Sequence, residues 1–479
     1  MNFSAVDPSP ELTPNIGGST WDLQNIQDKL RARSRTSYTS RYERVFEGAG
    51  AVGSAIAGAA RTARFRLGHG GSPYDSAPAM GTQCSGMSMA AFLFWIRANC
   101  EQDNLEQAIF LARDGELPLR MAEAMPSDYW SGVGLDYLHC GRKSWSVAAA
   151  SAMGVEKWFE LGMADENAFL RHAEKSLSVS RLLDRLGLGA EQASTSEYLS
   201  DLDFDAPFPQ GEVHRWHSFL EAGTTVELVE IESMKRKALV VGSLRQSGIG
   251  STPMALVDVG WRGQQSWMIS SLFREALDVD PLHLHFGGSG ISSFIDENIK
   301  IRRFAFDGAA RPSPMDDVVT CVEMFLGAGQ PRLVGYELLE NGSIKEVFDK
   351  AEVDITTSAI GSLWAGAIAL ASLLPTWTEL EKAGVDGSAN LSQEVCQLLT
   401  LFWDTPRADE SRILQGLRLE VDDAGNIISP VVDPYRVFEF IRGGGPHRHW
   451  RSGSLAATPQ PTKLMVSLYH ALRKAKGLD

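Results

Sequence analysis

Residues 109–118 read Ile-Phe-Leu-Ala-Arg-Asp-Gly-Glu-Leu-Pro, and they give the clearest indication of the fold class. An uncharged apolar run is typical of a buried strand, which we place at Ala108–Ala112. A polar turn, Arg113-Asp114-Gly115, follows at once. A helix is predicted from Pro118 to Ala124, because proline fits the first turn of a helix. Strand, turn and helix in this order are the repeating unit of an α/β protein.

Two further apolar runs repeat this arrangement. Leu135–Cys140 leads into Gly141-Arg142-Lys143, and Pro253–Val257 leads into Asp258 and a glycine loop. Additional strands are predicted at Ile299–Phe306 and Leu333–Leu338. Because parallel strands end at one edge of their sheet, we expect a Rossmann-like parallel sheet with a binding site at that edge.

The chain of 479 residues exceeds what one hydrophobic core usually organises. Residues 1–45 are polar and rich in turn residues, and we expect a flexible N-terminal arm. Residues 46–345 are predicted to form the α/β domain, with a helical insertion at about 147–220. Residues 346–479 are predicted to be mainly helical.

The charge balance limits the classes of partner. With 45 basic and 60 acidic residues the net charge is −15, which argues against nucleic acid and anionic membrane as partners. Five scattered cysteines without a CxxC pair indicate reduced thiols. The first residues lack a secretory signal, so a cytoplasmic protein is expected. The uncharged stretch 355–378 is diluted by Gly, Ser and Thr, which favours a buried helix over a membrane span.

The loop at Arg113, Asp114 and Gly115 is the first candidate binding site. Before a helix, backbone N–H groups and the helix dipole favour a phosphate, and Arg113 offers a planar fork of donors. The alternative is a turn in which Arg113 and Asp114 pair with each other.

The second candidate is the loop that runs from Asp258 to Gln264. Asp258 can hold ribose hydroxyls or a metal ion, and Gly260 and Gly263 let the backbone approach a bound group. Arg262 and Gln264 belong to the same loop. Glycines are also common in strand-to-helix turns for conformational reasons alone.

Three other sets of residues carry weaker signals. Arg142 and Lys143 add positive charge to the same edge, or belong to a solvated loop. Glu323 stands in an apolar helical run, where a carboxylate is costly unless it is paired or faces water. His283 and His285 share one strand face without completing a zinc site. The phosphate loop GxxxxGK[ST], the nucleophile elbow GxSxG and the HExxH motif do not occur.

The series Phe-Leu-Ala-Arg-Asp-Gly, Gly-Arg-Lys and Leu-Val-Asp-Val-Gly-Trp-Arg-Gly-Gln-Gln resembles the glycan phosphoribosyltransferase module of bacterial ribofuranosyltransferases, which are often called haloacid-dehalogenase-like hydrolases. The resemblance implies a phosphoribosyltransferase-like fold and a role in surface-polysaccharide biosynthesis. It implies transfer of 5-phosphoribosyl from phosphoribosyl pyrophosphate to a glycan hydroxyl, with Mg²⁺. In that family a phosphatase domain then removes the 5-phosphate. None is visible here, so we expect transfer alone or a separate phosphatase partner.

The resemblance also suggests roles for the candidate residues. Arg113 and Arg142 would hold the pyrophosphate, Asp258 the ribose hydroxyls or Mg²⁺, and the 260–264 backbone a phosphate. Asp114 or Glu323 would accept the proton of the acceptor hydroxyl.

The chain departs from the family at two positions, because Gly141 replaces a serine and Gln264 a threonine. A non-catalytic sensor of a phosphorylated sugar or nucleotide is therefore a second reading. A third is a haloacid-dehalogenase-like phosphatase with Asp114 as the acid, although its nucleophile would fall at Ala112, which cannot form a phosphoaspartate.

Overall fold

The computed structural model describes most of the chain, and every structural statement below refers to this part of it. The described residues are 39–67, 77–164, 177–194, 196–209, 211–261, 263–288, 299–306, 315–327, 331–349, 359–385, 390–415, 418–420, 428–430, 432–436 and 450–466.

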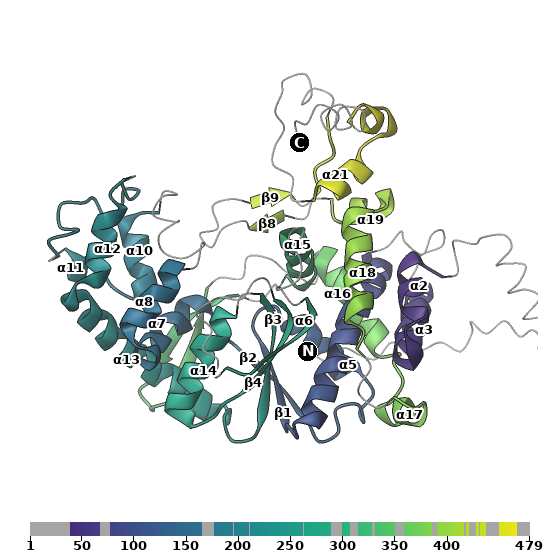
Figure 1. The fold of residues 1–479 in the computed structure, drawn as a ribbon, viewed down its shortest axis with the longest axis horizontal. Helices are drawn as coiled ribbons and strands as arrows, with labels where there is room; N and C mark the ends of the chain where they lie inside the picture. Colours follow the sequence, from purple (N-terminus) through teal and green to yellow (C-terminus); the bar gives the residue numbers. More distant parts are fainter. Residues whose placement is uncertain are drawn as a thin grey trace, which may run out of the picture.

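A five-stranded sheet forms the centre of this mixed α/β structure (Figure 1). The strand order is β2-β1-β3-β4-β5, and every neighbouring pair is parallel. The expected parallel sheet is thus confirmed. Its strands are β1 (Gln107–Leu111), β2 (Gly134–Leu138), β3 (Met254–Trp261), β4 (Leu282–Gly288) and β5 (Ile301–Phe306).

Helices cover both faces of the sheet, so alternate side chains of each strand enter different hydrophobic clusters. Ala108 and Phe110 of β1 belong to one cluster and Ile109 to the other. This alternation is the two-residue period of a strand buried on both faces. The first cluster includes residues of α5 (Met87–Gln102), α6 (Glu116–Ala124), α16 (Ala359–Ala371) and α18 (Ser392–Asp404); the second includes residues of α7 (Arg142–Met153), α13 (Gly223–Gln246) and α14 (Gln264–Leu277).

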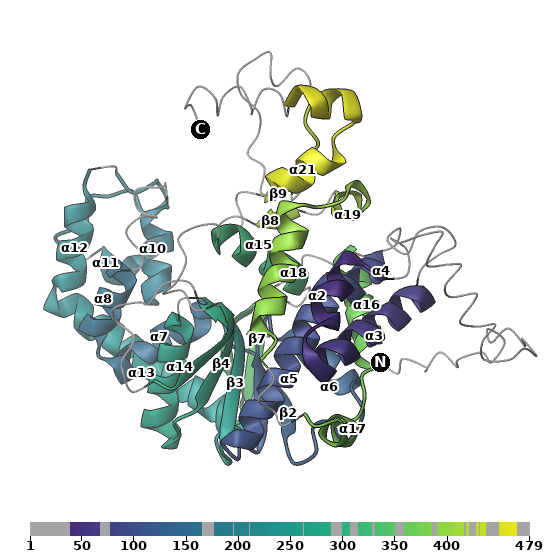
Figure 2. The same ribbon diagram turned by 45° about the vertical axis from the view of Figure 1, so that its right-hand side comes forward.

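The chain between β2 and β3 carries a helical region with a hydrophobic cluster of its own. Trp216, which is fully buried, belongs to this cluster. Figures 1 and 2 show the region to one side of the sheet, joined to it through α7 and α13. Its helices are α8 (Val155–Ala164), α10 (Val179–Leu186), α11 (Ala190–Ala193) and α12 (Val213–Glu221).

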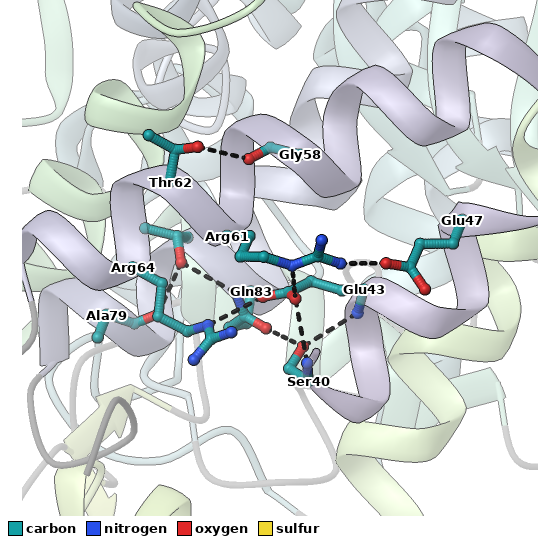
Figure 3. A network of polar contacts seen from close by, with 10 residues as sticks. Ser40, Glu43, Glu47, Gly58, Arg61, Thr62, Arg64, Ala79 and Gln83 are labelled. Atoms are coloured by element: carbon teal, nitrogen blue, oxygen red, sulfur yellow. Dashed lines mark hydrogen bonds and ion pairs between the residues drawn. The ribbon is translucent and has the colours of Figure 1, made fainter. Parts of the chain in front are cut away.

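The first described segments, α2 (Arg41–Glu47) and α3 (Gly50–Leu67), are held by a buried polar network (Figure 3). The Glu43 carboxylate is fully buried and accepts hydrogen bonds from Arg61 Nε at 3.0 Å and Arg64 Nε at 2.9 Å. It also accepts one from Gln83 Nε2 at 3.1 Å. Gln83 lies in the π-helix η2 (Thr82–Gly86), so the network joins α2 and α3 to η2. Of the expected N-terminal arm, residues 1–38 lie outside the described residues.

Helix α16 contains most of the uncharged stretch and is buried as expected, with Leu363 and Trp364 at most 1% exposed. It crosses α4 (Ala77–Gly81) at very short range. A Cβ at Gly366 would lie 1.8 Å from the carbonyl oxygen of Pro78, and one at Gly81 would lie 1.9 Å from that of Leu363. Only glycine allows this approach. None of the described helices combines the length and apolarity that crossing a bilayer requires.

The remaining elements follow β5. Residues Leu333–Leu338 form β6 as predicted, in an antiparallel hairpin with β7 (Ile344–Phe348) outside the main sheet. Both figures place α15 (Met315–Leu326) above the edge at which the central strands end. The described C-terminal elements are α17 (Trp377–Lys382), α19 (Ala408–Ile413), β8 (Arg418–Glu420), β9 (Ile428–Pro430) and α21 (Arg451–Ala457).

Candidate functional site

The strand connections diverge at the carboxyl ends of β1 and β3. From β1 the chain passes outward to β2, and it then returns to β3 on the other side of β1. Open α/β sheets bind ligands where the connections diverge in this way. Arg113 and Asp114 follow β1, and Asp258 and Gly260 lie in the last half of β3. The structure therefore brings the two predicted loops to the same point.

The loop after β1 is a tight turn with a cis peptide bond between Ala112 and Arg113. Arg113 is exposed and Asp114 is half-buried. A Cβ at Gly115 would lie 2.5 Å from the carbonyl oxygen of Leu111, so the turn requires glycine there. Helix α6 begins at Glu116, two residues before the predicted start.

Three helix N-termini meet at this edge, because α6, α7 and α14 begin shortly after β1, β2 and β3. Their N-cap residues are Gly115, Gly141 and Gly263, and none of the three supplies a side-chain capping bond. The N–H groups of a first helical turn have no intrahelical acceptor, and they lie at the positive end of the helix dipole. Three such turns at one edge favour an anionic ligand.

Close packing against β6 explains why position 141 is a glycine. Its Cβ would lie 2.8 Å from the carbonyl oxygen of Leu333 in β6. A serine, which the resembled family has here, would collide with this strand. Arg142 and Lys143 are the first two residues of α7, and their side chains lie outside the described residues.

In the loop after β3, Asp258 is half-buried and its Oδ1 accepts a hydrogen bond from the Val259 N–H at 2.8 Å. Gly260 has a φ of 96°, in the left-handed region that favours glycine. Gly263 has a φ of 77° and precedes Gln264, the first residue of α14. Arg262 lies outside the described residues.

Cys140 links the two loops electrostatically. Its thiol is buried and accepts a hydrogen bond from Gln265 Nε2 at 3.1 Å. Burial raises the pKa of Cys140 most, and the carboxylates of Asp258 and Asp114 raise it further. The two predicted acids therefore act on one thiol, although they come from different strands.

Sequence reasoning missed two polar residues at this edge, Glu116 and Tyr137. Glu116 is 3% exposed and forms an ion pair with Arg120 through Oε1. Its Oε2 and the Tyr137 hydroxyl are buried and have no hydrogen-bond partner within the part of the chain that the structure describes. Burial raises the pKa of Tyr137, and so do the charges of Glu116, Cys140 and Asp114. The position of Glu116 directly after Arg-Asp-Gly, in the first turn of the helix, could have indicated its place at this edge. Tyr137 gave no such signal, because its orientation depends on how β2 pairs with β1.

Glu323 is exposed and lies on α15, which Figures 1 and 2 place above the edge at which the central strands end. The structure thus assembles the loops that follow β1, β2 and β3, while the third predicted acid stands on another helix.

The two histidines of β4 have a structural role. His283 and His285 are fully buried, and their Nε2 atoms lie 2.8 Å from the Oγ atoms of Ser270 and Ser266 in α14. Burial lowers the pKa of His283 to about 3 and that of His285 well below its usual value. Both rings are therefore neutral and attach α14 to β4. Among the residues that the structure describes, no three His, Cys, Asp or Glu side chains form a potential metal site.

No family model matches the chain, and no curated protein is significantly similar to it in sequence. The resemblance to glycan phosphoribosyltransferases therefore depends on the quoted motifs alone.

Proposed function

We propose that this protein is a glycosyltransferase that moves 5-phosphoribosyl from phosphoribosyl pyrophosphate to a hydroxyl of a glycan or other acceptor and releases pyrophosphate. The observation that supports it most is the meeting of three helix N-termini without side-chain caps beside Arg113, at the point where the strand connections diverge. Such fixed positive dipoles stabilise a highly charged anionic leaving group such as pyrophosphate. The strand order β2-β1-β3-β4-β5 also agrees with a Rossmann-like sheet.

In this proposal the exposed guanidinium of Arg113 and the first turns of α6 and α14 bind the pyrophosphate. Arg142, Lys143 and Arg262 add positive charge from the neighbouring loops, and the Gly115 and Gly260–Gln264 backbone holds phosphate oxygens. Stabilising the charge on the departing pyrophosphate weakens the bond to the sugar, which passes through an oxocarbenium-like state.

Mg²⁺ would be held mainly by the phosphates of the donor, with Asp258 as the protein ligand. The Asp258 side chain is half-buried. Mg²⁺ prefers oxygen ligands and usually binds one or two carboxylates together with substrate phosphates. When bound, the ion would neutralise charge on the pyrophosphate. Asp258 could instead hold ribose hydroxyls.

Asp114 and Glu323 are the two proposed bases. Asp114 lies in the loop after β1, and Glu323 lies on α15 above the same edge of the sheet. A carboxylate that accepts the proton of the acceptor hydroxyl must come within hydrogen-bond distance of it. The proposed setting is the cytoplasm, in polysaccharide assembly, with a separate phosphatase for the remaining 5-phosphate.

A turnover assay tests this function. The purified protein is incubated with Mg²⁺, phosphoribosyl pyrophosphate and candidate acceptors, and pyrophosphate and phosphoribosylated product are measured. We expect both products, and we expect Asp258→Ala to abolish them while its circular dichroism spectrum stays that of the wild type. Release of orthophosphate from sugar phosphates would instead identify a phosphatase.

The second candidate function is a sensor that binds a phosphorylated sugar or nucleotide without turnover. The crowding of Gly141 by Leu333 favours it, because the position cannot hold the hydroxyl that the resembled enzymes have. Ligand binding without pyrophosphate release in the same assay would indicate a sensor.

A further inference from the structure

A hollow of about 640 Å³ lies along one face of α18, beside β5. Its described lining consists of residues of α18, the adjoining Thr405, and Ala305 of β5. The hollow is open to solvent, so a ligand would be bound along one side of α18. None of these lining residues belongs to the loops after β1, β2 or β3, so the hollow is distinct from the site proposed above.

The lining has the chemistry of a site for an uncharged polar ligand. Gln393, Gln397, Thr400 and Asp404 are exposed, and their spacing of four, three and four residues puts them on one face of α18. Amides and hydroxyls both donate and accept hydrogen bonds, as sugar hydroxyls do. The described lining contains one carboxylate and no cation. The neighbouring Arg41 donates to Thr405, but its charge is paired with Glu410 at 2.6 Å, which disfavours a phosphate. Leu401 adds an apolar surface for the C–H groups of a sugar ring.

The hollow begins near the same edge of the sheet as the proposed donor site. Gly260 of β3 is in register with Gly287 of β4, which is in register with Phe306 of β5. Ala305 precedes Phe306 and therefore lies about two strand spacings, roughly 10 Å, from the β3 loop. A chain of a few sugar rings lying along α18 can span this distance. Helix α15, which contacts α18, lies above the same edge in both views (Figures 1 and 2).

We propose that the hollow along α18 binds an uncharged, hydroxyl-rich glycan, and that it positions the acceptor for phosphoribosyl transfer. Glycan binding is inferred from the lining residues alone, whereas the acceptor role rests on the proposed function.

A matched set of variants tests the glycan site. Gln397→Leu combined with Thr400→Val removes two polar groups from the hollow while keeping the side-chain sizes, and both positions are exposed, so the fold should persist. The control is Gln102→Leu at the exposed end of α5. Binding is measured on an immobilised panel of neutral oligosaccharides and their sulfated counterparts.

We expect the wild type and the control to bind neutral oligosaccharides in preference to sulfated ones, and the double variant to bind them about tenfold more weakly. Equal binding by the double variant, or no binding to any neutral oligosaccharide, would overturn the glycan site.

A second assay tests whether the hollow positions the acceptor. It measures the release of pyrophosphate with a glycan that the protein binds as the acceptor. We expect the double variant to raise the KM for the glycan about tenfold and to leave the KM for phosphoribosyl pyrophosphate unchanged. An unchanged KM for the glycan contradicts the acceptor role. Glycan binding by a wild type that releases no pyrophosphate overturns the proposed transfer and leaves the hollow as a glycan site.

Discussion

Gly260 of β3 lies against Gly287 of β4 so closely that a Cβ at position 260 would be 2.5 Å from the Gly287 carbonyl oxygen and 2.7 Å from His285 Cβ. The glycine that suggested a phosphate loop is therefore required by the neighbouring strand. Its backbone can still face a ligand, but its identity is explained by packing.

Gly260→Ala should destabilise the fold by about 3 kcal/mol or more, because a left-handed φ and a steric clash both oppose the added methyl group. Gly132→Ala is the control, since Gly132 has a φ of 80° and open space around its Cβ position. It should cost about 1–2 kcal/mol. Urea unfolding of both variants measures the difference, and equal losses would mean that the contact with β4 is unimportant.

The buried network at Glu43 predicts that two Glu→Gln substitutions near Arg61 differ strongly in their effect on stability. Glu43→Gln leaves the guanidinium groups of Arg61 and Arg64 without their buried carboxylate, and we expect a loss of about 3 kcal/mol. Glu47→Gln removes the other, exposed partner of Arg61 and should change stability by at most about 1 kcal/mol. Chemical denaturation of both variants checks this. Equal effects would contradict a structural role for the network.

His283 and His285 predict a loss of stability in acid. Their pKa values are lowered in the folded protein from 6.5, so the unfolded chain binds more protons below that pH. Their contribution is complete above about pH 6.5 and falls by about 1.4 kcal/mol per pH unit for each histidine as the pH drops toward 3. His283→Asn should reduce this slope between pH 6 and 4. The exposed His214→Asn serves as control, and identical slopes would refute the assignment.

At two positions the chain differs from the resembled family, and restoring the family residue should change stability by different amounts. Gly141→Ser places its Cβ 2.8 Å from the Leu333 carbonyl oxygen, and we expect a loss of about 1–3 kcal/mol. Gln264→Thr alters the half-buried first residue of α14 and should cost less than about 1 kcal/mol. Thermal unfolding distinguishes them. A stable Gly141→Ser protein would mean that packing does not exclude serine.

Strands β1 and β3 could be predicted because each begins with an uncharged apolar run that stops at a polar residue, as β1 does between Leu111 and Arg113. The helix start at Glu116 was missed, since proline is also tolerated within the first turn and the Gly115 cap gave no side-chain signal. The strand order, and with it the placement of the Asp114 and Asp258 loops after neighbouring strands, depends on long-range pairing that no local pattern encodes. The same applies to Tyr137, which lies on the α6 face of β2 only because Phe110 is its partner in register.

Calorimetric titration with Mg²⁺ and phosphoribosyl pyrophosphate measures whether the edge at Arg113 binds a phosphorylated sugar donor. We expect binding by the wild type and by Arg181→Ala, whose arginine is exposed on α10. Arg113→Ala should bind about 10- to 100-fold more weakly, because it loses charge-assisted hydrogen bonds to the pyrophosphate. No binding by the wild type, or equal affinities for the two variants, would rule out donor binding at Arg113.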